Sequence, residues 1–320
     1  MATARITGGE PRGDRTWSTI LSSTLARPRR RLATTTAMVV CLAVSGVVDA
    51  APAPGSAAES TTALTLHRTI QTSPFDGSRV SMVDSEASAY VPRDHAVWLA
   101  DDNGRRLYVV DVRTGRLKRS IGRTALESVH RLGGGRQAGT NRTKDLESLA
   151  YDGRRDRLYL FSGSCCKATV RPTAFRLTRR SGRLRPESWQ PLRRGTDNTA
   201  AAWNPGNETM YVGNESTLRR YSYRRNRTGP AIKVPNLTGI LGMDFDGDGT
   251  RLVVARWEQR LSMVDWSDKA LRWTAKVSPL GVRDPRAVEF VRGRLWVADG
   301  YDGRRRSNPL DHAVFVLELR

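Results

Sequence analysis

The chain has 320 residues, 38% of them hydrophobic and 27% charged, a composition typical of a soluble globular protein with one large domain or two ordinary ones. Its formal net charge of +21 would attract nucleic acid, anionic cell-wall polymer or phosphorylated ligands. However, the arginines are spread along the chain, and no zinc-finger spacing, recognition-helix pattern or aromatic RNA-binding signature accompanies them. The sequence therefore argues against a specific nucleic-acid partner.

Residues 1–58 have the features of an export signal followed by a short linker. A basic segment at 27–31 precedes an apolar run at 37–48, which is too short to span a bilayer as a helix. Small residues allow cleavage near Ala50 or Ala57, and both the general and the twin-arginine export routes stay open. No later segment is apolar enough to cross a membrane. We therefore expect a secreted, extracellular protein whose mature part, residues 59–320, is a single domain.

The mature part contains five copies of a strand pair, spaced by about 40 to 60 residues. The first strand of each pair begins with a polar or small residue, and these strands are expected at 85–91, 145–151, 197–203, 239–245 and 284–290. The second strand is apolar and ends in a polar residue, as at 97–101, 158–162, 210–214, 252–256 and 295–299. Turn-forming residues connect the two strands, so each pair is expected to be a hairpin.

Further strands complete these units. A third strand is expected at 106–112, 173–179, 217–223, 260–266 and 312–319, and a fourth at 116–122, 186–192, 230–236 and 271–277. The fifth unit lacks a fourth strand, whereas residues 64–71 form an extra strand near the other end of the chain. Together they predict an all-β fold, a five-bladed β-propeller whose ring is closed by the N-terminal strand. A six-bladed ring is the alternative if residues 120–145 contain a degenerate blade, but their composition favours a loop.

Polar residues gather where this fold would place them on one rim. In a propeller, the loops before the first strands and those after the second strands share one face of the ring. The candidate ligand-binding residues on this face are Glu86, Asp101, Asp145, Glu147, Asn214, Arg256, Asp284, Arg286 and Asp299. The alternative is that these acids cap turns and neutralise arginines.

Two acidic features bear on calcium, the one candidate cofactor. Glu86 and Glu147 are the candidate metal ligands, because close carboxylates can hold Ca²⁺ or act as an acid–base pair. Residues 244–249 begin like a calcium loop but lack the later acids, since Leu252 and Ala255 stand at those positions. We expect a plain tight turn there, on the face opposite the rim. The four histidines show no metal-ligand spacing, and no nucleophile elbow is present.

Once the signal is removed, two adjacent cysteines remain, Cys165 and Cys166. A bridge between them would be strained, because neighbouring Cα atoms lie ~3.8 Å apart, below the usual disulfide range. In an oxidising compartment such a bridge can still form, and we expect it. Free thiols and links between chains are the alternatives.

Two segments resemble a known family. Residues 85–117 carry a Glu-Ala-Ser start, a Trp strand and an Asp/Asn-rich turn before a Leu-Tyr strand, and residues 145–163 begin with Asp-Leu-Glu. Both are similar to the first blades of the phytase-like, or esterase-like, propellers and the related SdiA-regulated family. Ala89 and Ser148 stand where that family favours Gly. The resemblance implies that Glu86, Asp145 and Glu147 face a pocket, and that calcium and an ester-type substrate are candidates.

These observations favour an exported propeller that binds a small-molecule ligand, a cell-surface ligand or a partner protein on its acidic rim without catalysis. Binding comes first because no complete catalytic constellation is present. The alternative is a calcium-assisted hydrolase of an ester or phosphoester, with Arg256 and Arg286 stabilising anionic charge. A third option is adhesion to an anionic polymer, which would weaken as salt is added.

Overall fold

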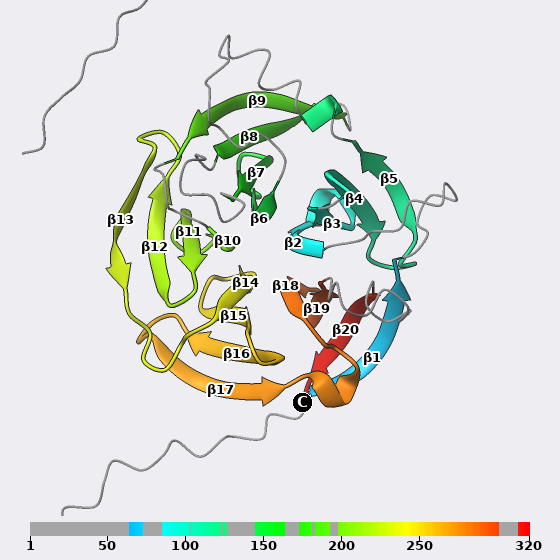
Figure 1. Cartoon of the computed structure of the whole chain (residues 1–320), viewed down its shortest axis with the longest axis vertical. Helices are drawn as coiled ribbons and strands as arrows, with labels where there is room; N and C mark the ends of the chain where they lie inside the picture. Colours follow the sequence, from blue (N-terminus) through cyan, green and yellow to red (C-terminus); the bar gives the residue numbers. More distant parts are fainter. Residues whose placement is uncertain are drawn as a thin grey trace, which may run out of the picture. The chain divides into compact units, whose positions relative to one another are not determined.

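The computed structural model describes residues 64–72, 85–102, 104–122, 124–126, 145–163, 173–180, 183–192, 198–300 and 313–320. These residues form five four-stranded antiparallel sheets arranged around a central channel, a five-bladed β-propeller (Figure 1). The expected fold class and blade number are confirmed. The predicted signal segment lies outside the described residues, as do residues 127–144 of the expected loop.

Each blade is a meander whose strands follow one another from the channel outwards. Blade 1 contains β2 (Ser85–Val91), β3 (Ala96–Asp101), β4 (Arg106–Asp111) and β5 (Leu117–Ile121), and blade 2 contains β6 (Leu146–Asp152), β7 (Arg157–Ser162), β8 (Thr173–Arg180) and β9 (Arg183–Pro191). Blade 3 contains β10 (Ala200–Asn204), β11 (Thr209–Asn214), β12 (Thr217–Ser222) and β13 (Arg227–Ile232), and blade 4 contains β14 (Ile240–Phe245), β15 (Arg251–Arg256), β16 (Arg260–Asp265) and β17 (Ala270–Lys276). Blade 5 contains β18 (Pro285–Val291), β19 (Arg294–Asp299), β20 (Ala313–Leu319) and β1 (Leu64–Gln71). Two short 3-10 helices, η1 (Pro92–Asp94) and η2 (Ser278–Leu280), lie between strands.

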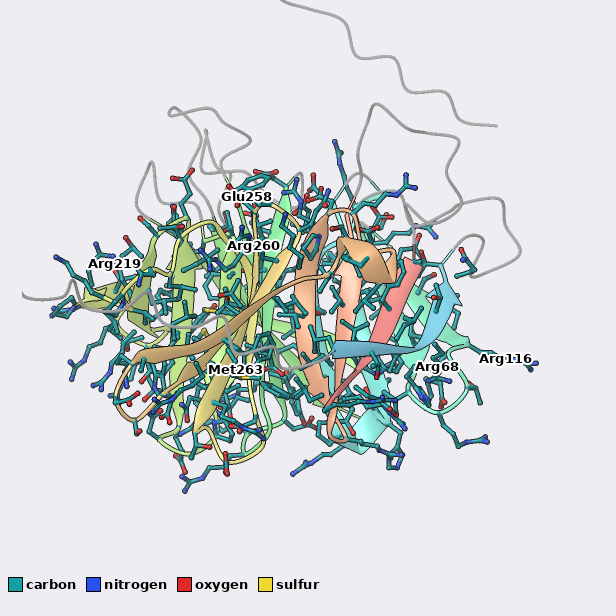
Figure 2. The ribbon with its side chains drawn as sticks, turned by 90° about the horizontal axis from the view of Figure 1, so that it is seen from below. Arg68, Arg116, Arg219, Glu258, Arg260 and Met263 are labelled. Atoms are coloured by element: carbon teal, nitrogen blue, oxygen red, sulfur yellow. The ribbon has the colours of Figure 1, made fainter. Side chains whose placement is uncertain are left out.

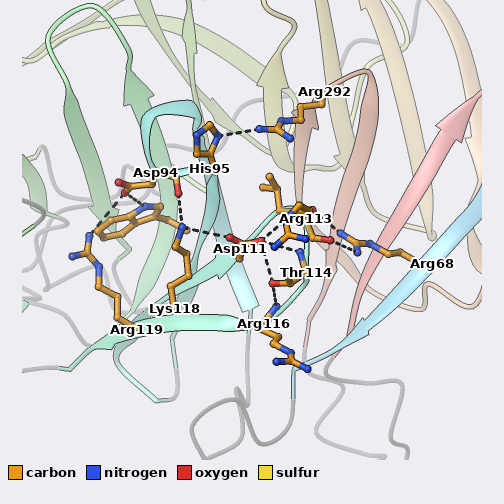
Figure 3. A network of polar contacts seen from close by, with 12 residues as sticks. Arg68, Asp94, His95, Asp111, Arg113, Thr114, Arg116, Lys118, Arg119 and Arg292 are labelled. Carbon is orange, nitrogen blue, oxygen red and sulfur yellow. Dashed lines mark hydrogen bonds and ion pairs between the residues drawn. The ribbon is translucent and has the colours of Figure 1, made fainter.

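The ring is closed by its two chain ends, as the sequence predicts. β1 pairs antiparallel with β20 and supplies the outermost strand of blade 5, where blue meets red in Figure 1. From β1, the Arg68 guanidinium donates to the carbonyls of Val112 at 2.7 Å and Arg113 at 3.0 Å in blade 1 (Figure 3). The N-terminal strand therefore removes the open edge of β20 and also ties blade 5 to blade 1.

The hydrophobic core consists of layers between neighbouring blades, because each blade buries both of its faces. In β3, Trp98 and Ala100 pack against blade 2, whereas Val97 and Leu99 pack against blade 5. Alternate residues thus serve opposite layers, which explains why the second strands are apolar throughout instead of alternating with polar residues.

The fourth strand of blade 3 differs from its expected position. It spans Arg227–Ile232 instead of 230–236, because a tight turn with Asn226 at φ 47° starts it early, directly after β12. The amide of Asn226 donates to the carbonyl of Tyr223 at 3.2 Å and closes this turn. Pro230 is tolerated because β13 is an outer edge strand.

Candidate functional site

In four of the five blades, one residue near the start of the inner strand does not pair with the second strand. The pairing of the inner strand with the second strand is interrupted at Glu86, Glu147, Leu241 and Arg286. In blade 3, Thr199 precedes β10 at the equivalent position. Such β-bulges re-aim a side chain, and all of these lie at the same end of their strands. We call Glu86, Glu147, Thr199, Leu241 and Arg286 the mouth ring, because Glu86, Glu147 and Thr199 line the channel.

Arg286 makes several of the contacts at the mouth ring. Its Nη1 lies 3.4 Å from Glu86 Oε2 of blade 1, and its Nε donates to Asp284 Oδ2 at 2.9 Å. Its guanidinium also lies 5.0 Å from the ring centre of Trp257, which comes from the loop after β15. Trp257 is 50% exposed, and among the described residues only one other large hydrophobic side chain is exposed. An exposed indole beside a charged channel mouth is a feature of binding sites.

Two further carboxylates meet at Gly163. A Cβ atom at this glycine would lie 2.4 Å from Glu147 Oε1 and 2.5 Å from Asp145 Oδ2, so both carboxylates lie against the same piece of backbone. The Gly163 amide donates to the Asp145 carbonyl at 2.8 Å. The channel below is narrow, with a volume of about 10 Å³. This is room for about one water molecule, so a ligand would bind at the mouth and not inside.

Three other predicted site residues bind the surrounding backbone, and a fourth, Asn214, lies at the end of a strand. Asp101 is buried and accepts the Gly104 amide at 2.8 Å, and buried Asp299 accepts the amides of Arg283 and Asp284. Arg256 donates to the carbonyls of Thr238 and Asn236 and to Ser262 Oγ, and Asn214 pairs with Thr217 in the β11–β12 hairpin. These contacts fit the alternative that rim polar groups cap turns.

The structure offers little support for a shared metal. Among the described residues, no group of three His, Cys, Asp or Glu side chains is arranged to hold an ion. The Glu86 carboxylate is paired with a guanidinium, which competes with a cation for the same oxygens. Calcium at Glu86 and Glu147 therefore stays a prediction for titration to test. Cys165 and Cys166 lie outside the described residues.

The acidic segment on the opposite face is a tight turn, as predicted. Asp246 Oδ1 accepts the amides of Thr250 at 2.9 Å and Arg251 at 3.0 Å. Gly249 has a φ of 75°, and a Cβ there would overlap Asn204 Oδ1. These carboxylates are used to close the hairpin between β14 and β15.

A cavity of about 440 Å³ opens at the end of the channel opposite the mouth ring, beside the hairpin turns. Every blade contributes an aromatic residue to it from the equivalent inner-strand position: Tyr90, Tyr151, Trp203, Phe245 and Phe290. The preceding position is Ala in blades 1, 2 and 3, but Asp244 in blade 4 and Glu289 in blade 5.

These two acids join the inner strands of three blades. Asp244 Oδ2 accepts the Phe290 amide at 2.8 Å, and Glu289 Oε2 accepts the Tyr90 amide at 2.8 Å. Ser88 Oγ donates to Glu289 Oε1, also at 2.8 Å. Burial raises the pKa of Glu289 to about 7, and burial together with the neighbouring Glu289 raises the pKa of Asp244 well above its usual range.

From the sequence, Asp244 is interpreted only as part of a turn, and Glu289 is not predicted as a site residue. The signal was present in the aligned inner strands, where an acid replaces an alanine at one position in two successive blades. The role of these acids could not be predicted, because their partners, Tyr90 and Phe290, belong to the next blade in each case.

The described fold and site define a five-bladed β-propeller with a charged ring at one mouth of its channel. No family model and no curated protein match the sequence. Among solved structures, the glutaminyl cyclase of Myxococcus xanthus is similar, with a TM-score of 0.54 and 11% identity over 80% of this chain and 96% of that one. The hydrazine synthase of Kuenenia stuttgartiensis has a TM-score of 0.39 and 12% identity over 67% of this chain and 55% of that one. At such identities the likeness to the cyclase supports the fold alone, and the phytase-like resemblance stays a prediction.

In the described part of the chain, none of the helices combines the length and apolar character needed to cross a membrane.

Proposed function

We propose that this protein is a secreted propeller that binds a small ligand at the mouth ring, through an ammonium group of the ligand. The observation that carries the proposal is the pair of bulges that set Glu86 and Glu147 at the same end of adjacent inner strands. Bulges are found next to functional sites, where they direct side chains that a regular strand would not.

The local charge supports a cationic group. The carboxylates of Glu86, Asp145, Glu147 and Asp284 gather at the start of the inner strands, and Arg286 contacts two of them. This acidic concentration occurs on a chain of net charge +21, so it is the opposite of what composition alone would place there. An ammonium group accepts no hydrogen bonds and donates three, which suits neighbouring carboxylates such as those of Asp145 and Glu147 beside Gly163.

The remaining groups of the mouth ring suit the rest of such a ligand. Trp257 lies beside the mouth ring, and its half-exposed indole, with Arg286 5.0 Å from the ring centre, offers an apolar contact to the ligand. The Thr199 hydroxyl donates to the Ile240 carbonyl at 3.0 Å and keeps its acceptor lone pairs for a ligand. We infer non-catalytic recognition as the first function, since no nucleophile with an adjacent base lies at the mouth ring among the described residues.

The glutaminyl cyclase among the similar structures suggests a second candidate to test, cyclisation of a glutaminyl residue, although the likeness itself supports the fold alone. In that reaction an amine nitrogen attacks the side-chain amide carbon and ammonia leaves. Glu147 or Glu86 would take a proton from the attacking amine as a general base. A calcium-assisted hydrolase is a weaker alternative, because a bound ion would have to displace the Arg286 guanidinium from Glu86.

A titration with a short peptide that begins with glutamine tests both candidates. We expect the wild-type protein to bind it, and the N-acetylated peptide, which has no ammonium group, to bind at least about tenfold more weakly. The E86Q/E147Q variant should lose the same factor. E208Q/E318Q, which removes two carboxylates elsewhere on the ring, should bind like the wild type. Release of ammonia with a pyroglutamyl product would establish the cyclase; binding without product would establish recognition. Equal binding of the acetylated peptide would refute both.

Export is part of the same proposal, on the strength of the basic and apolar segments at 27–31 and 37–48. We expect the protein in the culture medium of its host, with an N-terminus between residues 51 and 59 by Edman sequencing. Full-length chain retained inside the cells would contradict it.

A further inference from the structure

A groove between blades 2 and 3 concentrates positive charge. Its volume is about 830 Å³. Seven arginines line it, with Glu208 as the one acid in the described lining: Arg155, Arg157, Arg176, Arg220, Arg224, Arg225 and Arg227. We call this feature the arginine groove. Nothing in its composition suits the ammonium ligand proposed for the mouth ring.

Three of these arginines form ion pairs with two acids of blade 2. Arg155 lies 2.9 Å from Asp152, and Arg157 and Arg176 lie 3.4 Å and 2.8 Å from Glu187. The other four, Arg220, Arg224, Arg225 and Arg227, are exposed and make no ion pair with a carboxylate among the described residues. They come from β12, the following turn and the start of β13, so the early turn at Asn226 brings them together on one hairpin. Four exposed guanidinium groups on one wall suit an anionic partner that carries several charges.

The aromatic residues of the groove are already engaged. The Arg176 guanidinium lies 5.0 Å from the ring centre of Tyr223, and that of Arg155 lies 5.9 Å from the ring of Trp203. Tyr221 is buried, and its hydroxyl donates to Asn226 Oδ1 at 3.2 Å. Burial raises the pKa of Tyr223 to about 12, so its hydroxyl stays neutral and adds no negative charge to the groove. Nucleic-acid bases, which bind single-strand proteins by stacking on free aromatic faces, find few such faces here.

We propose that the arginine groove binds a non-aromatic polyanion that carries phosphate or sulfate groups along its backbone. The planar guanidinium fork matches phosphate and sulfate oxygens in a bidentate manner. A polymer contacts several arginines at once, whereas a single free phosphate would neutralise only one or two of them. For a secreted protein, such a polymer is met at a cell surface, and the contact would hold the propeller there while the mouth ring binds its own ligand.

The test uses the full chain, inorganic polyphosphate as the probe and two variants with equal loss of charge. The groove variant is R220Q/R224Q/R225Q/R227Q. The control, R113Q/R116Q/K276Q/R320Q, removes four exposed cations from other blades. Figure 2 shows Arg116 on the far side of the molecule from Arg219, which neighbours Arg220 in β12. Melting temperatures of both variants establish that the ring is folded.

We expect the wild type and the control to bind polyphosphate within about twofold of each other, and the groove variant to bind at least about tenfold more weakly. The slope of log affinity against log salt should also become shallower in the groove variant alone, because fewer counterions are released. Equal losses in both variants would show attraction by overall charge and overturn the proposal. So would tighter binding of single-stranded DNA than of polyphosphate at equal phosphate concentration, which would make the groove a nucleic-acid site.

Discussion

The buried acids Asp244 and Glu289 predict an unusual dependence of stability on pH. In the folded protein Glu289 holds its proton up to a pKa of about 7, whereas in the unfolded chain it releases it near its ordinary value of 4.5. Between these values the folded state binds more protons than the unfolded state. The free energy of unfolding therefore falls as the pH rises through this window, opposite to the behaviour of salt-bridged surface carboxylates.

The size of the effect follows from the two pKa values. Each pKa unit corresponds to about 1.4 kcal/mol, so full ionisation of Glu289 costs the folded state about 3 kcal/mol. Asp244, whose pKa is also raised, acts in the same direction. Replacing Glu289 by Gln keeps an acceptor for the Tyr90 amide at 2.8 Å but removes the titration. We expect E289Q to gain about 3 kcal/mol over the wild type between pH 4.5 and pH 7.5.

Urea unfolding at pH 4.5, 5.5, 6.5 and 7.5 measures this difference directly. E258Q is the matched control, because it removes one carboxylate whose side chain is 76% exposed. The free energy of unfolding of E258Q should change with pH in the same way as that of the wild type. The free energy of unfolding of E289Q should exceed the wild-type value by a margin that grows as the pH rises. Parallel profiles for all three proteins would show that Glu289 does not carry a raised pKa, and the reasoning about the buried pair would be wrong.

Three further outcomes are expected. D246A, which leaves the amides of the β14–β15 turn without their acceptor, should lower the free energy of unfolding in urea by about 2 kcal/mol. E258Q, which changes a carboxylate whose side chain is 76% exposed, should change it by less than about 0.5 kcal/mol. Removing residues 1–72 exposes the edge of β20, so size-exclusion chromatography should show dimers or aggregates; a monomer with an unchanged melting temperature would argue against closure by β1. G163A places a Cβ against the side chains of Glu147 and Asp145, which must shift, so it should weaken ligand binding at the mouth at least about tenfold in calorimetry, with the melting temperature measured alongside as a check on folding; unaltered affinity would separate these carboxylates from the site.

The fold was predictable because each blade repeats one pattern and both faces of each sheet are buried. The closing strand at 64–71 was expected at its observed bounds, since an unpaired strand at one end matches a blade short of one strand at the other. The fourth strand of blade 3 was misplaced, because its start depends on the left-handed conformation of Asn226, which the sequence pattern does not reveal.

The site was predictable only in part. Repeat alignment places Glu86, Glu147 and Arg286 at one position, but the bulges that turn these residues aside depend on strand register and not on composition. Asp101 and Asp299 are also acidic and lie near the same rim as Glu86 and Glu147. However, both are buried and accept backbone amides. A carboxylate that caps a loop and one that faces a ligand are not distinguishable in a single sequence.

The most direct test of the central claim is a crystal structure of the protein with the glutamine-starting peptide bound. The account predicts that the peptide ammonium group lies within hydrogen-bond distance of Glu86 or Glu147 at the mouth ring, with the chain beside Trp257. The aromatic cavity at the other end of the channel holds the second pair of acids, Asp244 and Glu289. A peptide ammonium group found in that cavity, with the mouth ring empty, would contradict the proposed function.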